Sequence, residues 1–197
     1  GAHRGRFVFR NIYRPGLAGV LERLQTRFRL ALVSGDNDRE RANLTRLFGQ
    51  QAELKFGQLP ESKLSYIRSL QDAGGKVIMI GDGLNDAGAL KQSDVGIAVT
   101  EDISAFSPAC DAIWAADQFG RLPDVLRFTR SVMWVVFACF VVSFCYNAVG
   151  LTLAMTGRLS PLASAILMPS STLSVIGLAL LGTRWAAWRA RLGGRVS

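Results

Sequence analysis

The chain has 197 residues, of which 49% are hydrophobic and 19% are charged, and its formal net charge is +8. This length suits one domain of ordinary size or a small domain with an appendage, and the apolar fraction excludes an intrinsically disordered chain. The three cysteines form no Cys-x-x-Cys pair, which excludes a disulfide framework.

Residues 1–126 predict an α/β unit in which short apolar strands alternate with helices. Apolar residues recur at helical spacing over 14–27, 38–48 and 60–73. Apolar runs typical of buried strands cover 30–33, 76–80 and 95–99. Such runs favour a parallel sheet covered on both faces, in which ligands lie beyond the carboxyl ends of the strands. Chemistry is therefore expected where polar residues follow these strands, at Ser34, Asp36, Asp82 and Asp86.

The sharpest chemical signal is the segment Gly81-Asp82-Gly83-Leu84-Asn85-Asp86. Asp82 is expected at a strand tip, between glycines that let a ligand approach the backbone. Asp86 follows four residues later, near the start of the next helix, so both carboxylates can converge on one hard cation. Mg²⁺ suits this pair because it needs few protein oxygens and keeps waters and a phosphate oxygen. A capped strand-to-helix turn with solvated acids is the alternative.

Two earlier positions are candidates for binding phosphate. The hydroxyl of Ser34 and the amide of Gly35 follow the first strand, although Asp36 beside them also suits a helix cap. Lys63 follows Pro60 and can reach the sheet edge as a point charge on phosphate. A solvated surface lysine is the alternative for Lys63.

Residues 127–183 predict two membrane-spanning helices. From 132 to 183 the only charged residue is Arg158, which lies in a polar bend between apolar runs at 132–155 and 162–181. As helices these runs extend ~36 Å and ~30 Å at ~1.5 Å per residue, enough for a bilayer core of ~30 Å. A buried helical hairpin in a soluble protein is the alternative.

Basic residues flank this hairpin on both sides. Arg127 and Arg130 precede it, and residues 184–197 form a basic tail. The positive-inside rule therefore places the α/β unit and the C-terminus in the cytoplasm, with the hairpin in the plasma or inner membrane. Because the excess charge lies at these flanks and no aromatic and basic binding motif is present, we expect no nucleic-acid partner.

The segment Met79–Leu90 resembles the hinge motif of P-type ATPases. Ser34-Gly35-Asp36-Asn37 and Pro60-Glu61-Ser62-Lys63 are similar to their Thr-Gly-Asp-Asn and Pro-x-x-Lys elements. The resemblance implies a haloacid-dehalogenase-like (HAD-like, Rossmannoid) phosphorylation domain that works with Mg²⁺ and ATP. It implies Mg²⁺ ligation by Asp82 and Asp86, a phosphate hinge at Gly81, Gly83 and Asn85, and catalytic roles for Ser34, Gly35, Asp36 and Lys63.

The hairpin resembles the copper-transporting group of heavy-metal pumps, and residues 166–169 look like the pumps that serve haem-copper oxidase assembly. The resemblance implies a site for Cu⁺ that is partly built from Tyr146, Asn147, Met168, Ser171 and Thr172. A thioether suits soft Cu(I), and neither span has the carboxylate that a divalent ion would favour. Two structural roles are the alternatives to metal binding. Met168 faces lipid, or Tyr146 and Asn147 form hydrogen bonds between the helices.

The departures from this family are equally informative. Its phosphorylated aspartate lies in Asp-Lys-Thr-Gly-Thr, which this chain lacks, as it lacks the nucleotide-binding domain and the Cys-Pro-Cys helix. We therefore expect the C-terminal part of a pump that is inactive alone and works with the lipid bilayer, a heavy-metal ion and its missing N-terminal part. A pump for a divalent metal such as Zn²⁺ and a catalytically silent, membrane-anchored HAD-like regulator are the alternatives.

Overall fold

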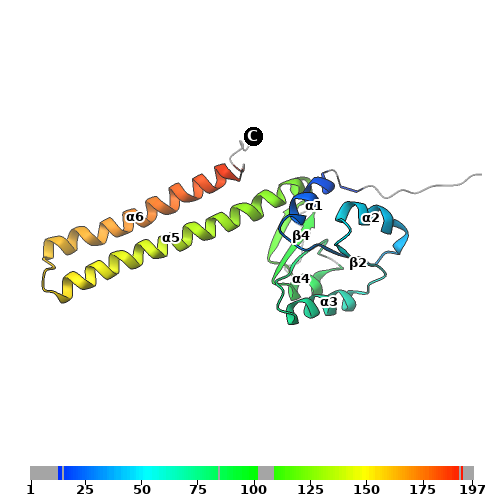
Figure 1. Ribbon diagram of the computed structural model, residues 1–197, viewed down its shortest axis with the longest axis horizontal. Coiled ribbons are helices and arrows are strands. Elements are labelled where there is room, and N and C mark those ends of the chain that lie inside the picture. The colour runs from blue at the N-terminus through cyan, green and yellow to red at the C-terminus, as the bar shows by residue number, and fades with distance from the viewer. Residues whose placement is uncertain (1–12, 15, 84, 102–108, 191, 193–197) are drawn as a thin grey trace, which may run out of the picture. The chain divides into compact units, whose positions relative to one another are not determined.

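The computed structural model describes residues 13–14, 16–83, 85–101, 109–190 and 192. It divides into two compact units, one ending at Leu122 and one beginning at Pro123 (Figure 1). Pro15, Leu84, Arg191 and the end of the basic tail at 193–197 lie outside the described residues.

The first unit alternates helices with strands, as the hydrophobic pattern predicts. Its elements are α1 (Leu17–Gln25), β1 (Ala31–Val33), η1 (Asp38–Glu40), α2 (Arg41–Phe48), β2 (Glu53–Lys55), α3 (Pro60–Asp72), β3 (Ile78–Gly81), α4 (Ala87–Gln92), β4 (Val95–Thr100), β5 (Ala112–Ala115) and η3 (Ala116–Arg121). The helix predicted over 38–48 begins as a 3₁₀ turn, and the side chain of Asn37 caps this turn by accepting the Arg39 amide at 3.1 Å.

Every strand pairing in the described part of the chain is parallel. β1 pairs with β2, and β3 pairs with β4, which pairs with β5. These pairings form a two-stranded and a three-stranded sheet, whereas the sequence predicts one sheet. The predicted parallel direction of the strands is confirmed. The strands form two sheets instead of one, since β1 and β3 are not hydrogen-bonded to each other.

The hydrophobic core of this unit surrounds β4. Ile97 and Ala98 of this strand are buried, as are Leu90 of α4 and Ile67 of α3. Gly96 lets β4 approach α4 closely, since a Cβ atom at this position would lie 2.4 Å from the Leu90 carbonyl oxygen. Tight packing of α4 on β4 holds the segment between β3 and α4 in place.

The second unit contains two long helices, α5 (Leu122–Met155) and α6 (Pro161–Arg189), which run side by side from the bend that joins them (Figure 1). Both are long and apolar enough to cross a membrane, and their most apolar windows are not buried by the rest of the described chain. The alternative of a hairpin buried in a soluble core therefore does not describe this structure.

Both helices extend beyond the predicted apolar spans of 132–155 and 162–181. Residues 122–131 and 182–189 continue the helices, and Pro123 is tolerated because it lies in the first turn of α5. Ser160 caps α6 by accepting the Ala163 amide at 3.1 Å, and Pro161 occupies the first turn.

Small residues let the two helices meet near both ends of the hairpin. A Cβ atom at Gly182 would lie 2.8 Å from Cγ1 of Val135, and one at Gly150 would lie 3.2 Å from Cδ2 of Leu167. The valine and leucine side chains therefore fill the space that these glycines leave.

Candidate functional site

Asp82 stands directly after β3, at the strand end where the sequence predicts it. Its side chain is exposed, and its carboxylate accepts the Asn85 backbone amide at 3.3 Å and the Asn85 side-chain amide at 3.5 Å. Gly83 between them has a φ of 83°, which an L side chain rarely adopts. The glycine and Asn85 together hold the turn that presents Asp82.

Lys63 and Asp86 form the most buried ion pair among the described residues. Lys63 Nζ lies 2.6 Å from Asp86 Oδ1, and the two side chains are 12% and 13% exposed. Lys63 belongs to the first turn of α3, while Asp86 immediately precedes α4. The sequence predicts both residues at the site but does not predict that they bind each other.

Gly81 makes room for this pair. A Cβ atom at Gly81 would lie 2.7 Å from Asp86 Oδ2 and 2.9 Å from Asp86 Cβ. The carboxylate of Asp86 is thus confined between the backbone of β3 and the ammonium group of Lys63. Glycine is required here by close approach, since a larger residue would displace Asp86.

Ser34 and Asp36 form a closed turn after β1. The Ser34 hydroxyl donates to Asp36 Oδ2 at 3.2 Å and accepts the Asp36 amide at 3.1 Å. The Gln58 amide donates to the Ser34 carbonyl at 2.9 Å, and the Gly57 amide donates to the Asp36 carbonyl at 2.8 Å. The loop that leads into α3, and therefore to Lys63, is fastened to the Ser34 turn by these bonds.

The residues at the β3 tip fit Mg²⁺ by their chemistry. Carboxylate oxygens are hard ligands, and Mg²⁺ in phosphoryl-transfer sites takes one or two protein carboxylates besides waters and phosphate oxygens. Asp82 and Asp86 supply two such groups. Among the described residues, no group of three or more histidine, cysteine or acidic side chains is arranged to hold a metal ion.

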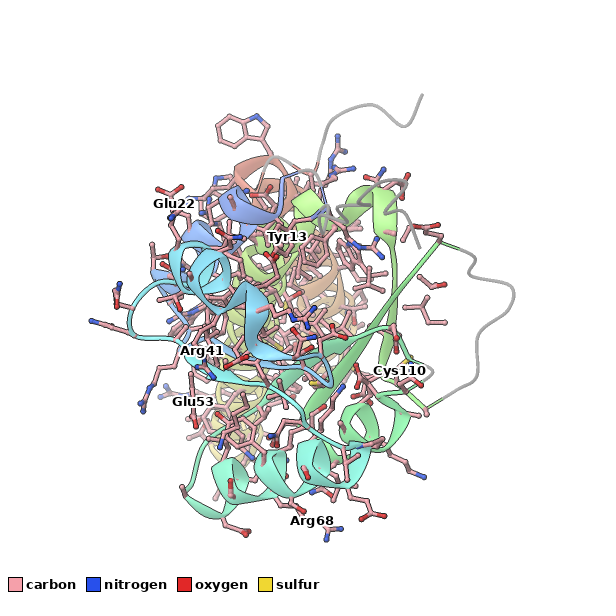
Figure 2. All side chains as sticks on the ribbon, turned by 90° about the vertical axis from the view of Figure 1, so that its right-hand side faces the viewer. Tyr13, Glu22, Arg41, Glu53, Arg68 and Cys110 are labelled. Carbon is pink, nitrogen blue, oxygen red and sulfur yellow. The ribbon has the colours of Figure 1, made fainter. Side chains whose placement is uncertain are left out.

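Acidic side chains with phenol partners lie elsewhere on the same unit. Tyr13 donates to Glu40 at 3.0 Å, and Tyr66 donates to Glu53 at 2.7 Å (Tyr13 and Glu53 are labelled in Figure 2). Burial and the bond to Glu53 raise the pKa of Tyr66 to about 12, and the same bond lowers the pKa of Glu53. The bond between Tyr66 and Glu53 ties α3 to β2.

Asp94 fastens the start of β3. Its carboxylate accepts the Val77 amide at 2.9 Å, the Lys76 ammonium at 2.9 Å and the Gln71 amide at 3.1 Å. The backbone amide, followed by the two side chains, holds the pKa of Asp94 well below its usual range. β3, whose last residue precedes Asp82, is therefore anchored at its opposite end by the Asp94 carboxylate.

In the hairpin, the predicted metal-site residues come from both helices, Tyr146 and Asn147 from α5 and Met168, Ser171 and Thr172 from α6. The Tyr146 hydroxyl lies 3.0 Å from the hydroxyl of Ser174, a residue that the sequence does not single out. Met168 is 74% exposed, so its thioether lies on the surface of the hairpin, and Asn147 is exposed as well. The hydroxyls of Ser171 and Thr172 donate to the Met168 carbonyl at 2.8 and 3.3 Å.

A family model described as haloacid dehalogenase-like hydrolase matches residues 3–94. The probable copper-exporting P-type ATPase V of Mycobacterium tuberculosis is 31% identical over 160 residues, which cover 81% of this chain and 21% of that protein. The manganese-exporting P-type ATPase of Mycobacterium bovis is 33% identical over 177 residues, which cover 87% of this chain and 24% of that protein. The chain thus spans less than a quarter of the length of these relatives.

The fold is found in a solved structure as well. The crystal structure of a zinc-transporting PIB-type ATPase in its E2.Pi state matches with a TM-score of 0.70 and 23% identity, over 91% of this chain and 28% of that chain. This match and the family model show that the chain has a HAD-like unit followed by two long apolar helices.

Proposed function

We infer that the chain is the C-terminal part of a heavy-metal P-type ATPase, and we propose that the complete protein uses ATP hydrolysis to move Cu(I) across a membrane. The observation that carries this proposal is the buried pair of Lys63 and Asp86 beside Asp82, at the carboxyl end of a parallel strand, in a chain that continues into an apolar hairpin. In this assignment the chain supplies the phosphoryl site and two membrane helices.

At the phosphoryl site, the residues bind and orient. Asp82 and Asp86 are the groups that would hold Mg²⁺, which when bound neutralises the charge that develops on a transferred phosphoryl group. Lys63 keeps a second positive charge next to Asp86, within 2.6 Å. The Gly35 amide would bind a phosphoryl oxygen, and the Ser34 hydroxyl would do so on turning from Asp36 Oδ2, to which it donates in this structure. Catalysis at such a site consists of positioning and electrostatic stabilisation.

The aspartate that accepts the phosphoryl group belongs, in this proposal, to the missing N-terminal part. Ser34 follows β1 and Asp82 follows β3, and in the described part of the chain these strands pair only with β2 and β4. A strand between β1 and β3 would join the two sheets and bring its own carboxyl end between Ser34 and Asp82. This is where an acceptor aspartate has to lie to reach both sides of the site.

For the transported ion, the side chains favour Cu(I) on chemical grounds. Met168 offers a soft thioether, and neither helix contains a carboxylate within its apolar stretch. The relatives argue for testing divalent ions as well, since those named above are described as exporters of copper and of manganese, and the solved structure as zinc-transporting. A divalent cargo is therefore the second candidate.

The orientation of the hairpin follows from charge. Arginines precede α5's apolar stretch and follow that of α6, while Arg158 alone lies in the bend. We propose that the HAD-like unit and the C-terminus face the cytoplasm, in a plasma or inner membrane.

Metal-stimulated ATP hydrolysis by the complete protein tests both the proposed ATPase activity and the proposed Cu(I) cargo. Cu(I) under reducing conditions should stimulate hydrolysis, and Zn²⁺ and Mn²⁺ should not. Asp82→Asn should abolish this activity, while Asp72→Asn, a change of the same chemistry at an exposed end of α3, should leave it intact.

Each other result has a defined meaning. Stimulation by Zn²⁺ or Mn²⁺ alone would reject Cu(I) as the cargo but keep the pump. An Asp82→Asn protein with normal turnover would reject the proposed Mg²⁺ site. A complete reading frame without Asp-Lys-Thr-Gly-Thr, together with no phosphoenzyme, would instead identify a catalytically silent regulator.

A further inference from the structure

Among the described residues, one pair of hydroxyl groups joins the two helices of the hairpin, which are also linked by the longer bond from Cys139 Sγ to the Val175 carbonyl at 3.8 Å. The phenol oxygen of Tyr146 on α5 lies 3.0 Å from the hydroxyl oxygen of Ser174 on α6. Other hydroxyls of α6 donate to carbonyls one turn back in their own segment: Ser164, Ser170, Ser171, Thr172 and Thr183. The bond to Tyr146 is therefore of a different kind, because it crosses from one helix to the other.

The direction of this bond follows from the second partner of Ser174. The Ser174 hydroxyl lies 2.8 Å from the Ser170 carbonyl, to which it donates. A serine hydroxyl carries one hydrogen, so it accepts from Tyr146 and cannot also donate to it. Tyr146 is thus the donor, and a chain of two hydrogen bonds runs from its phenol through Ser174 to the backbone of α6.

This direction determines what the phenol oxygen can do next. With its proton donated to Ser174, the phenol oxygen keeps its lone pairs for another partner. A lone pair attracts a cation, whereas a freely rotating hydroxyl can place its proton there and repel the cation. The carbonyl of Ser170 cannot rotate, so the orientation is fixed by the helix backbone.

We propose that Ser174 is a positioning residue for Tyr146, which holds the phenol proton so that the phenol oxygen is an acceptor for the transported metal ion. The inference rests on the proposed function, in which Tyr146 contacts the cargo. Ser174 itself need not touch the ion. A purely structural role for the bond, as a link between two apolar helices, is the competing explanation.

The test uses the complete protein and the metal ion that stimulates the wild type, and it measures ATP hydrolysis against metal concentration. Ser174→Ala removes the acceptor, Ser174→Thr retains a hydroxyl, and Tyr146→Phe removes the phenol oxygen. The double variant S174A/Y146F shows whether the two residues act through each other. Ser164→Ala is the matched control, since that hydroxyl also donates to its own segment but has no partner from α5 among the described residues.

We expect Ser174→Ala to raise the metal concentration for half-maximal hydrolysis about three- to tenfold, the range of one interhelical hydrogen bond in a membrane, without changing the maximal rate. Ser174→Thr should remain within about twofold of the wild type, and the double variant should equal Tyr146→Phe.

Four results would overturn the inference. The first two concern Ser174→Ala: a metal dependence like that of the wild type, or a lower maximal rate with an unchanged half-maximal metal concentration. The third is a double variant whose shift in half-maximal concentration is the product of the two single shifts. The fourth is a shift in Ser164→Ala as large as that in Ser174→Ala. A wild-type protein that no metal stimulates would overturn the proposed function itself, which is a different observation from any of these four.

Discussion

Gly81→Ala is the sharpest test of the site, because its effect can be worked out from the geometry. The new Cβ atom would lie 2.7 Å from Asp86 Oδ2 and 2.9 Å from Asp86 Cβ, whereas ordinary contacts at such positions begin at 3.4 Å. Asp86 therefore has to retreat by roughly half an ångström, and its 2.6 Å contact with Lys63 prevents rotation of the carboxylate alone.

A displacement of this size lowers the catalytic rate and, as overpacking of one side chain, destabilises the fold by about 1 kcal/mol. Misplacing a catalytic group by ~1 Å lowers rates about 100-fold, so half of that shift predicts a loss of about tenfold, or about 1.4 kcal/mol. Gly88→Ala in the same motif is the control, because its nearest neighbour, Leu64 Cδ1, would lie 3.6 Å away. Alanine within α4 should be neutral or stabilise the protein by up to ~1 kcal/mol.

The assay is ATP hydrolysis by the complete protein, accompanied by its thermal unfolding midpoint. We expect Gly81→Ala to lose about tenfold in turnover at temperatures where the protein stays folded, with a slightly lower midpoint, and Gly88→Ala to retain both turnover and midpoint. Normal turnover of Gly81→Ala, or an equal loss in the two variants, would show that the position of Asp86 does not matter and would refute the reasoning.

Three further predictions concern the stability of the HAD-like unit, measured by denaturant unfolding of the complete protein. Lys63→Met should destabilise it by about 3–5 kcal/mol, since a buried carboxylate loses its cation, whereas Lys76→Met, at a lysine side chain that is 87% exposed, should have little effect. The pKa of Tyr66 is raised from the ordinary tyrosine value of 10 to about 12 in the folded protein. The stability that this shift contributes is therefore complete below pH 10 and is lost as the pH rises towards 12. Tyr66→Phe should abolish this loss. Gly96→Ala should destabilise by about 1–3 kcal/mol, because its Cβ atom would lie 2.4 Å from a backbone oxygen, whereas Gly19→Ala, with nothing within 4 Å, should stabilise by up to ~1 kcal/mol. Equal stabilities within either matched pair, or an unchanged loss between pH 10 and 12 in Tyr66→Phe, would contradict these explanations.

Local patterns were sufficient to predict the strand tips and the apolar hairpin. A run such as 95–99 is apolar throughout and ends in polar residues, so its place in a buried parallel strand can be read from the chain itself. β2 was not predicted, because two of its three residues, Glu53 and Lys55, are charged and its pairing with β1 depends on residues far away in the sequence.

Contacts between distant segments were beyond such patterns. Lys63 and Asp86 are 23 residues apart, and their pairing depends on how α3 packs beside α4. The partner of Tyr146 could not be predicted either, since α5 and α6 are apolar on all sides and their periodicity does not fix how they face each other. The serines at 170 and 174, one helical turn apart, were the available signal.

The close contacts of Gly182 with Val135 and of Gly150 with Leu167 have a mechanical consequence. They lie near opposite ends of the hairpin, so α5 cannot slide along or roll against α6 without driving a side chain into backbone. Force applied to one helix is therefore passed to the other, and the pair travels as a single rod. If the chain is part of a pump as proposed, an ion bound at Tyr146 would be released when the two helices shift together against the rest of the protein, rather than by a gap that opens between them.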